Sequence, residues 1–253
     1  MIGTDNRGPR VVILAGGKGT RLRPFTTILP KPLLPIGDRA ILEIVIEQLR
    51  LAGLTRLTLA VGYLSHLIEA VFGDGSAYGV SIDYHHEHSP LGTAGALAGL
   101  DDLDEPFLMM NGDLITTLDY SALLDAHVLN GNALTIATQE RTATIDFGVL
   151  LLGEHNGATQ PVLGYNEKPT SRHAVSMGIY VVDPSLLRLI EPGAYLDFPD
   201  LVLSAIAAGE QVGAYAFDGL WLDIGRHEDY ERAVSEFADV DSLLFRQDAA
   251  SES

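Results

Sequence analysis

The sequence predicts an α/β fold: a mixed, mainly parallel sheet flanked by helices and built as a single domain. Short continuous apolar runs alternate along the chain with amphipathic stretches, and a cluster of glycines directly follows the first run. Continuous apolar runs are typical of buried parallel strands, and strands that alternate with helices form a helix-covered parallel sheet. The length of 253 residues, 47% of them hydrophobic, allows one large domain with a sizeable core.

The alternation is clearest in the first half of the chain. Apolar runs predict strands at 11–14, 57–61, 80–84, 107–110 and 134–137. Between them, apolar residues at helical spacing predict helices at 40–51, 64–72, 94–99 and 120–129. Gly53 follows the first of these helices, as expected of a helix end.

The pattern loosens after about residue 140, where we expect the second half to add a smaller lobe. Strands are predicted at 148–152, 175–182 and 212–217, and helices at 185–190, 198–208 and 226–237. We expect a flexible tail at 1–9, one continuous domain at 10–240 and a polar tail at 241–253.

Charge and cysteine content exclude several classes of function. A net charge of −18 argues against sequence-independent binding to nucleic acid or to an acidic membrane surface, since both need basic faces. The absence of cysteine excludes disulfides, thiolate metal sites and thiol nucleophiles, and it suits a reducing, cytoplasmic location.

The strongest local signal is the glycine-rich loop after the first strand. It reads Leu14-Ala15-Gly16-Gly17-Lys18-Gly19-Thr20-Arg21, and glycines let a backbone turn sharply and present its N–H groups to an anion. The loop lacks the Gly-Lys-Ser/Thr of a Walker A motif and the third glycine of a dinucleotide fingerprint. It therefore predicts a phosphate site of another kind, at the edge where α/β sheets bind ligands.

Lysines and carboxylates mark further parts of this site. The only lysines are Lys18, Lys31 and Lys168, each beside glycine or proline, and a lysine is a compact charge suited to phosphate. Asp113 ends the apolar run at 107–110, and Asp223 is a second candidate in Trp221-Leu-Asp-Ile-Gly225. One or two carboxylates together with phosphate oxygens are what Mg²⁺ usually takes.

Five separated blocks resemble the sugar-1-phosphate nucleotidyltransferases. Gly16-Gly-Lys-Gly-Thr-Arg-Leu-Arg-Pro24 with Leu29-Pro-Lys-Pro-Leu-Leu-Pro-Ile36 looks like the family signature, and the other blocks are 87–97, 107–113, 164–169 and 221–225. The resemblance implies a GT-A-like, Rossmann-like fold. It also implies an enzyme that joins a nucleoside triphosphate to a sugar 1-phosphate and releases pyrophosphate.

The resemblance assigns a role to each matching residue. Arg21 and Lys31 would bind phosphates, and Asp113 and Asp223 would hold Mg²⁺. Lys168 would bind the sugar phosphate and Glu167 the sugar hydroxyls. The rest of the sugar side would be Asn111, Gly148 and Gly178. Lys18 stands where the family varies and is left out of the site.

The loop at 87–97 would read the base. Its Pro90-Leu-Gly92-Thr93-Ala-Gly-Ala form looks like mannose-1-phosphate guanylyltransferases and related heptose-1-phosphate enzymes. Glu87 stands where thymidylyl and uridylyl members usually carry Gln. An ionised carboxylate only accepts hydrogen bonds, which matches the paired N1–H and N2–H donors of guanine. GTP is therefore the expected nucleotide, unless Glu87 points to solvent.

The expected reaction is an in-line attack of the sugar 1-phosphate on the α-phosphorus of GTP. The two substrates bring about six negative charges together, and two unit charges 5 Å apart repel by roughly 3 kcal/mol at an effective dielectric of 20. Arg21, Lys31, Lys168 and Mg²⁺ would offset this repulsion.

Three alternatives stay open at this point. They are thymidylyl or uridylyl transfer to glucose 1-phosphate, a non-catalytic regulatory relative that binds sugar nucleotides, and a small cytidylyltransferase of terpenoid or molybdenum-cofactor type. A homodimer is the expected assembly, since symmetric dimers are the commonest oligomers.

Overall fold

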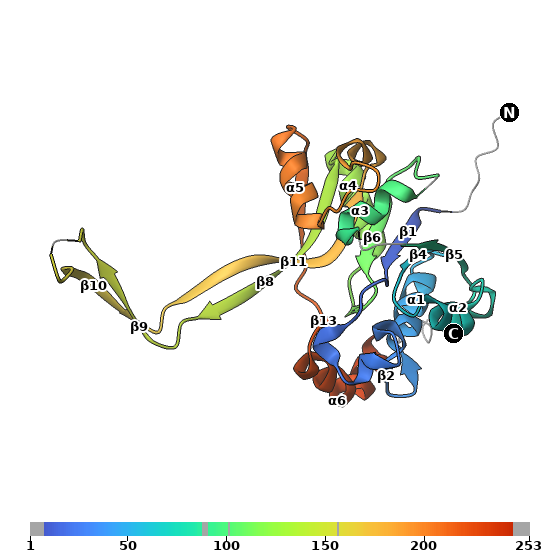
Figure 1. Ribbon diagram of the computed structural model, residues 1–253, viewed down its shortest axis with the longest axis horizontal. Coiled ribbons are helices and arrows are strands. Elements are labelled where there is room, and N and C mark those ends of the chain that lie inside the picture. Colours follow the sequence, from blue (N-terminus) through green and yellow to red (C-terminus); the bar gives the residue numbers. More distant parts are fainter. Residues whose placement is uncertain (1–7, 88–90, 101, 156, 245–253) are drawn as a thin grey trace, which may run out of the picture.

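A seven-stranded sheet forms the centre of the protein in the computed structural model, which describes residues 8–87, 91–100, 102–155 and 157–244 (Figure 1). The strand order is β12-β8-β11-β6-β1-β4-β5. Their bounds are β1 Arg10–Leu14, β4 Arg56–Val61, β5 Ser81–His86, β6 Phe107–Asn111, β8 Leu134–Thr144, β11 Thr170–Val182 and β12 Val212–Ala216. The α/β fold with a mixed sheet is confirmed.

The sheet is parallel except at one strand. β1 pairs in parallel with β4 and β6, β4 with β5, and β12 with β8, whereas β11 runs antiparallel to both β6 and β8. The predicted strand at 80–84 begins one residue later and ends two residues later, as β5. The predicted strands at 134–137 and 175–182 are parts of much longer ones.

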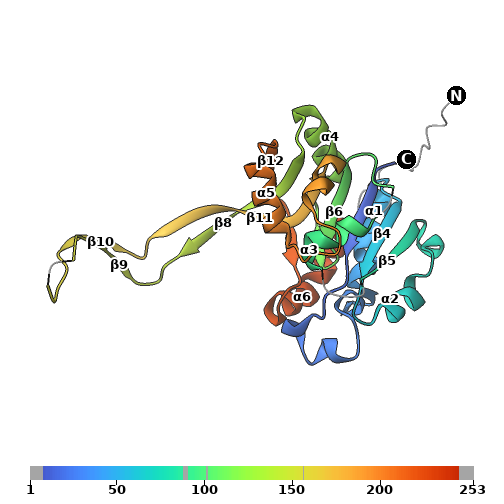
Figure 2. The same cartoon turned by 45° about the horizontal axis from the view of Figure 1, so that its top comes forward.

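Helices cover both faces of the sheet (Figure 2). On one face Val11 and Ile13 of β1 belong to a core with α1 (Ile41–Leu51), α2 (Ser65–Phe72) and α4 (Tyr120–Asn130). On the other face Val12 belongs to a core with α3 (Gly92–Gly95) and α5 (Phe198–Ala207). Alternate residues of a strand point to opposite faces, which explains why a continuously apolar strand serves both cores.

A third small core lies beside the sheet, under α6 (His227–Leu244). Here β7 (Leu114–Thr116) pairs antiparallel with β13 (Trp221–Asp223), and β2 (Pro35–Ile36) pairs with β3 (Arg39–Ala40). Because α6 runs to Leu244, the helix enters the segment predicted as a polar tail; residues 245–253 lie outside the described part. None of the described helices is both long and apolar enough to cross a membrane.

A two-stranded arm projects from the sheet where a smaller lobe was expected (Figures 1 and 2). β8 and β11 continue past the sheet as a paired ribbon, from Gln139↔Val175 to Thr144↔Thr170. Beyond it, β9 (Gly148–Leu152) pairs antiparallel with β10 (Val162–Glu167). The expectation of a lobe was wrong because the long strands β8 and β11 leave the core as a ribbon with no helix packed on it.

Candidate active site

The carboxyl ends of three neighbouring parallel strands position the site. Leu14 is in register with Ala60 of β4 and with Asn111 of β6. Ala15 donates its N–H to the Ala60 carbonyl at 2.8 Å, and Gly112 donates to the Leu14 carbonyl at 2.9 Å. The loops that follow β1, β4 and β6 therefore begin side by side, at the edge where open α/β sheets bind ligands.

The glycine-rich loop packs closely on its neighbours. A Cβ on Gly16 would lie 3.1 Å from Glu87 Oε2, and a Cβ on Gly62 would lie 3.1 Å from the Gly16 carbonyl oxygen. Gly19 has a φ of +58°, and its carbonyl accepts the Thr26 hydroxyl at 2.8 Å. Glycine thus fits the backbone contacts of this loop, whereas Gly17 faces open space and can approach a ligand.

A cavity of about 790 Å³ opens above these loops, within the size range of small-ligand sites. Most of the predicted nucleotide and phosphate residues line it: Leu14, Ala15, Gly16, Gly17, Gly19, Arg21, Lys31, Glu87, Gly92, Thr93, Asn111 and Asp113. Thr20 begins the turn between Gly19 and Arg21 but is not among the lining residues. Pro90 lies outside the described residues.

An ion pair ties the predicted phosphate ligand Lys31 to Asp113. Lys31 Nζ donates to Asp113 Oδ2, with the two side chains only 12% and 20% exposed. The other oxygen, Asp113 Oδ1, is buried and has no hydrogen-bond partner within the described residues. Buried carboxylate oxygens are normally satisfied, so this free oxygen is suited to a ligand or ion.

Asp223 ends β13 and lies beside Asp113, which directly precedes the paired strand β7. Asp223 is in register with Leu114, and Ile224 donates its N–H to the Asp113 carbonyl at 3.1 Å. Burial, and then repulsion from the Asp113 carboxylate, raises the pKa of Asp223, while Lys31 and Arg21 act in the opposite direction. The structure thus brings Arg21 and Lys31 near the two carboxylates.

The donor set fits a hard divalent cation. Two carboxylates lie close enough to repel each other, and one has an unpaired buried oxygen. A cation between them would relieve the repulsion and satisfy that oxygen, and two carboxylates are enough for Mg²⁺ when phosphate supplies further ligands. No larger group of metal-binding side chains occurs among the described residues.

Two of the predicted sugar-side residues meet at this edge of the sheet. Gly178 lies in a bulge of β11, between Ser176 and Tyr180, with a φ of +76°. A Cβ there would lie 2.6 Å from Asn111 Nδ2. Glycine is therefore required at 178 to accommodate the Asn111 amide, which lines the cavity.

The other sugar-side residues lie on the arm and not at the cavity. Gly148 begins β9 and is in register with Glu167, the last residue of β10. Lys168 Nζ pairs with Asp146 Oδ1 at 2.7 Å, and both side chains are exposed. A role for these three residues at the sugar stays a prediction, because they lie on the arm that projects from the sheet (Figure 1) and none of them lines the cavity.

Glu87 lies at the cavity beside Gly16, half-buried. Its backbone N–H extends the β4–β5 register by donating to the Val61 carbonyl at 3.0 Å. Burial raises the pKa of its carboxyl group. The side chain therefore contacts the glycine-rich loop and does not simply extend into solvent.

Eight further residues line the cavity that were not assigned to the site: Lys18, Pro32, Ala60, Gly62, Tyr63, Gly112, Tyr195 and Asp197. Tyr195 donates its hydroxyl to Asp197 Oδ2 at 2.9 Å, and Leu196 pairs with Leu91 through its backbone at 2.8 Å. The segment at 191–197 carries no glycine-rich or charged motif, so only its long-range pairing with the base-reading loop reveals it.

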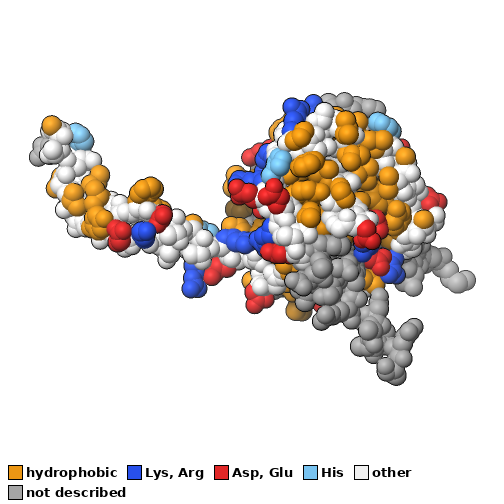
Figure 3. Space-filling model, turned by 90° about the horizontal axis from the view of Figure 1, so that it is seen from below, with side chains coloured by type: hydrophobic (Ala, Val, Ile, Leu, Met, Phe, Trp, Pro, Cys, Tyr) orange, Lys and Arg blue, Asp and Glu red, His pale blue; other side chains and the backbone are white. Residues whose placement is uncertain are grey.

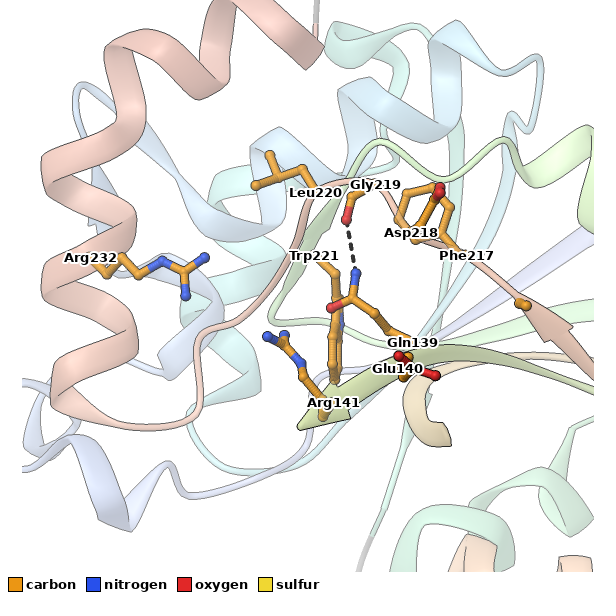
Figure 4. A pocket seen from close by; sticks show the side chains of 10 residues that line it. Gln139, Glu140, Arg141, Phe217, Asp218, Gly219, Leu220, Trp221 and Arg232 are labelled. Carbon is orange, nitrogen blue, oxygen red and sulfur yellow. Dashed lines mark hydrogen bonds between the residues drawn. The ribbon is translucent and has the colours of Figure 1, made fainter. Parts of the chain in front are cut away.

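A second hollow lies at the root of the arm, beside Trp221 (Figure 4). Its volume is about 590 Å³, and Arg141 lies over the Trp221 ring, 4.9 Å from the centroid. Arg21, Arg226 and Arg232 also face the space around Asp223. Arg21 lines both the cavity at the glycine-rich loop and the space around Asp223. Cationic side chains therefore extend from the glycine-rich loop to the root of the arm.

Comparison with known proteins places this site in a family. The chain is 36% identical over 233 residues to a mannose-1-phosphate guanyltransferase of Candida albicans, and 32% identical over 245 residues to a UTP–glucose-1-phosphate uridylyltransferase of Synechocystis. These matches cover 87% and 89% of this chain, which spans 62% of the length of each relative.

A solved structure and a family profile agree with these matches. The structure of HddC from Yersinia pseudotuberculosis, complexed with GMP-PN, superimposes with a TM-score of 0.67 at 25% identity, covering 91% of this chain and 100% of the other. The profile described as nucleotidyl transferase matches residues 10–240. On this match, which covers most of its length, the chain belongs to the nucleotidyl transferase family.

Proposed function

We propose that the protein transfers a nucleoside monophosphate from a nucleoside triphosphate, GTP in preference, to a sugar 1-phosphate of the mannose or heptose type. The observation that carries this proposal is the convergence of Arg21 and Lys31 with Asp113 and Asp223 at the end of the glycine-rich loop. A site for two polyanions needs this combination of backbone donors, cations and metal-binding carboxylates.

The proposed reaction forms one phosphorus–oxygen bond and breaks another. An anionic oxygen of the sugar 1-phosphate attacks the α-phosphorus, and the bond to the bridging oxygen breaks, so that pyrophosphate leaves with that oxygen. No general base is required because the nucleophile already carries a negative charge. Rate enhancement comes from alignment and from charge stabilisation.

The residues of the cavity divide this task between them. The backbone of the glycine-rich loop and Arg21 hold the triphosphate, and Lys31 stabilises charge at the phosphate oxygens while pairing with Asp113. Asp113 and Asp223 would hold Mg²⁺, which supplies positive charge at the phosphates when bound. Glu87, which lies at the cavity beside Gly16, would face the base.

Glu87 supports GTP as the preferred nucleotide. A half-buried carboxylate that accepts from two adjacent donors matches the Watson–Crick edge of guanine and faces repulsive lone pairs on uracil or thymine. The Candida relative is a mannose-1-phosphate guanyltransferase, and the similar solved structure is complexed with GMP-PN. Uridylyl transfer to glucose 1-phosphate is the second candidate, supported by the Synechocystis relative.

The test is a matrix of five nucleoside triphosphates against several sugar 1-phosphates, read as pyrophosphate release. We expect release with GTP together with mannose or heptose 1-phosphate, and none without the sugar phosphate. Strong turnover with dTTP or UTP and none with GTP would overturn the choice of base. Release of pyrophosphate that does not depend on any sugar phosphate would contradict transfer itself.

A further inference from the structure

The end of the arm exposes an unusual concentration of apolar side chains. We call residues 145–167 the outer hairpin; it contains β9 and β10. Of the eighteen exposed large hydrophobic side chains in the described part of the chain, eight lie here: Ile145, Phe147, Leu150, Leu151, Leu152, Val162, Leu163 and Tyr165. Contiguous exposed apolar surface of this kind marks an interaction site.

The apolar residues cover both faces of the outer hairpin. Leu150 is in register with Tyr165, and the adjacent Leu151 is in register with Gly164. Neighbouring residues of a strand point to opposite faces, so neither face is polar. In the described structure β9 and β10 pack extensively only on each other. An isolated two-stranded hairpin is at best marginally stable in water, which indicates that this one is covered in the working protein.

The direction of the arm is fixed by continuous strands. β8 pairs with β12 inside the sheet and with β11 along the ribbon, without a break in β8. The ribbon from Gln139 to Thr144 spans roughly 20 Å at about 3.3 Å per residue. Lys168 and Glu167 follow at its end, so reaching the cavity of the same molecule would require the ribbon to fold back on itself.

An exposed apolar rim borders the cavity and offers a place for the outer hairpin to land. The loop after Arg21 exposes Phe25 and Ile28, which are 48% and 75% accessible. Phe25 lies 5.8 Å from the His227 ring, and Thr26 bonds to the Gly19 carbonyl. The rim, residues 25–29, is thus attached to the glycine-rich loop itself.

The arm also avoids the strong negative charge of the chain. Between residues 139 and 176 there are four acidic side chains and three basic ones, a balance of −1, within a chain of net charge −18. Two copies of so acidic a protein repel each other, and a nearly neutral arm is the part that can approach another copy with least opposition. Figure 3 shows orange side chains along the outer part of the arm.

We propose that the outer hairpin packs against a second copy of this chain and delivers Lys168 and Glu167 to the cavity of that copy. In a dimer with two-fold symmetry the exchange is reciprocal: each chain's hairpin packs on the other chain, so both sites are completed and both hairpins are covered. The eight side chains offer about 800 Å² of surface at roughly 100 Å² each, the share that one partner gives to a standard stable interface. The delivery of Lys168 and Glu167 rests on the proposed function; the dimer does not.

Size-exclusion chromatography with light-scattering detection tests the dimer. We expect the 253-residue chain to be dimeric and the double variant Phe147→Asp, Leu151→Asp to be monomeric. The matched control places the same change on exposed residues of α5, Leu203→Asp with Ile206→Asp, and should remain dimeric. A monomeric parent chain, or a dimer that survives the changes in the hairpin, would overturn the proposal.

Mixing two inactive variants tests the delivery of Lys168. Asp113→Asn removes the metal ligand of one chain and Lys168→Ala removes the arm lysine of the other. After random reassortment, half of the dimers contain one chain of each variant. In such a dimer the cavity of the Lys168→Ala chain receives the intact arm of the Asp113→Asn chain, so one of its two sites is complete. Activity should therefore return to about a quarter of the parent value.

Each other outcome of the mixing experiment has its own meaning. Absence of recovery in reassorted dimers would overturn delivery in trans, because a lysine acting in its own chain cannot rescue its partner. Full activity of Lys168→Ala alone would overturn the delivery of Lys168 in any arrangement. Full activity of Asp113→Asn alone would contradict the proposed function, while light scattering would still decide the dimer.

Discussion

Replacing Glu87 by glutamine is the sharpest test of base recognition. The carboxylate of Glu87 lies at the cavity beside Gly16, where it can accept two hydrogen bonds from guanine. Hydrogen bonds to a charged acceptor contribute about 1.5–3 kcal/mol each. Glu87→Gln leaves one acceptor and turns the other position into a donor that faces a guanine donor.

The half-exposed position of Glu87 sets the size of the effect. Solvent near the side chain weakens the charged bonds, so we take the lower part of that range and expect a loss of about 2–3 kcal/mol. This corresponds to a fall of roughly 30- to 150-fold in kcat/KM for GTP. The same variant should gain activity with UTP or dTTP, because the amide can donate to one acceptor and accept from N3–H.

The assay is pyrophosphate release at fixed sugar 1-phosphate with GTP, UTP and dTTP in turn. Glu69→Gln on α2 is the control, since it makes the same chemical change outside the cavity. Circular dichroism establishes that both variants are folded. An unchanged ratio of kcat/KM for GTP over UTP in folded Glu87→Gln would refute the assignment of Glu87 to the base.

Three further predictions concern stability and the metal site. Burial raises the pKa of Glu87, so the ionised side chain destabilises the ligand-free fold at pH values above the ordinary pKa of glutamate. Glu87→Gln should therefore have a higher melting temperature than the parent at pH 7. This difference should vanish below about pH 4, where Glu87 is protonated in both the folded and the unfolded chain. Gly92→Ala places a Cβ 2.4 Å from the Leu196 carbonyl oxygen at a φ of +78°, and it should lower the free energy of unfolding, measured in urea, by at least about 2 kcal/mol. Gly193→Ala is the control: it has the same φ but open space around the Cβ, and it should lower the free energy of unfolding by only about 1 kcal/mol. Asp113→Asn should lower turnover by about 10³-fold or more while the far-ultraviolet spectrum stays unchanged, and a folded variant with full turnover would remove Asp113 from the site.

Local pattern and strand order explain why so much of the central sheet could be predicted. The apolar runs that become β1, β4 and β6 each end in glycine or a polar residue, and parallel strands bring such ends together. Lys31 lies well past the end of β1, in a short turn, so its meeting with Asp113 does not follow from strand order; the resemblance to a family supplied it. The resemblance to a family supplied Asp223, whose own surroundings in the sequence are those of an ordinary turn.

The arm and the Tyr195 segment could not be read from the sequence for a physical reason. The ribbon of β8 and β11 is polar along Arg141–Thr144, which gives no alternating signal, yet it pairs fully with Thr170–His173. Tyr195 and Asp197 reach the cavity through backbone pairing with Leu91, and such long-range contacts leave no local periodicity. Gly178 reads as an ordinary strand glycine until its bulge against Asn111 is seen.

The arrangement of cations and carboxylates is the centre of this account, and a crystal structure with a non-hydrolysable GTP analogue and Mg²⁺ tests it most directly. We expect one metal ion shared by Asp113 and Asp223, the triphosphate along the glycine-rich loop against Arg21 and Lys31, and the guanine edge on Glu87. A nucleotide bound at another surface, or a metal ion that neither aspartate touches, would contradict the account.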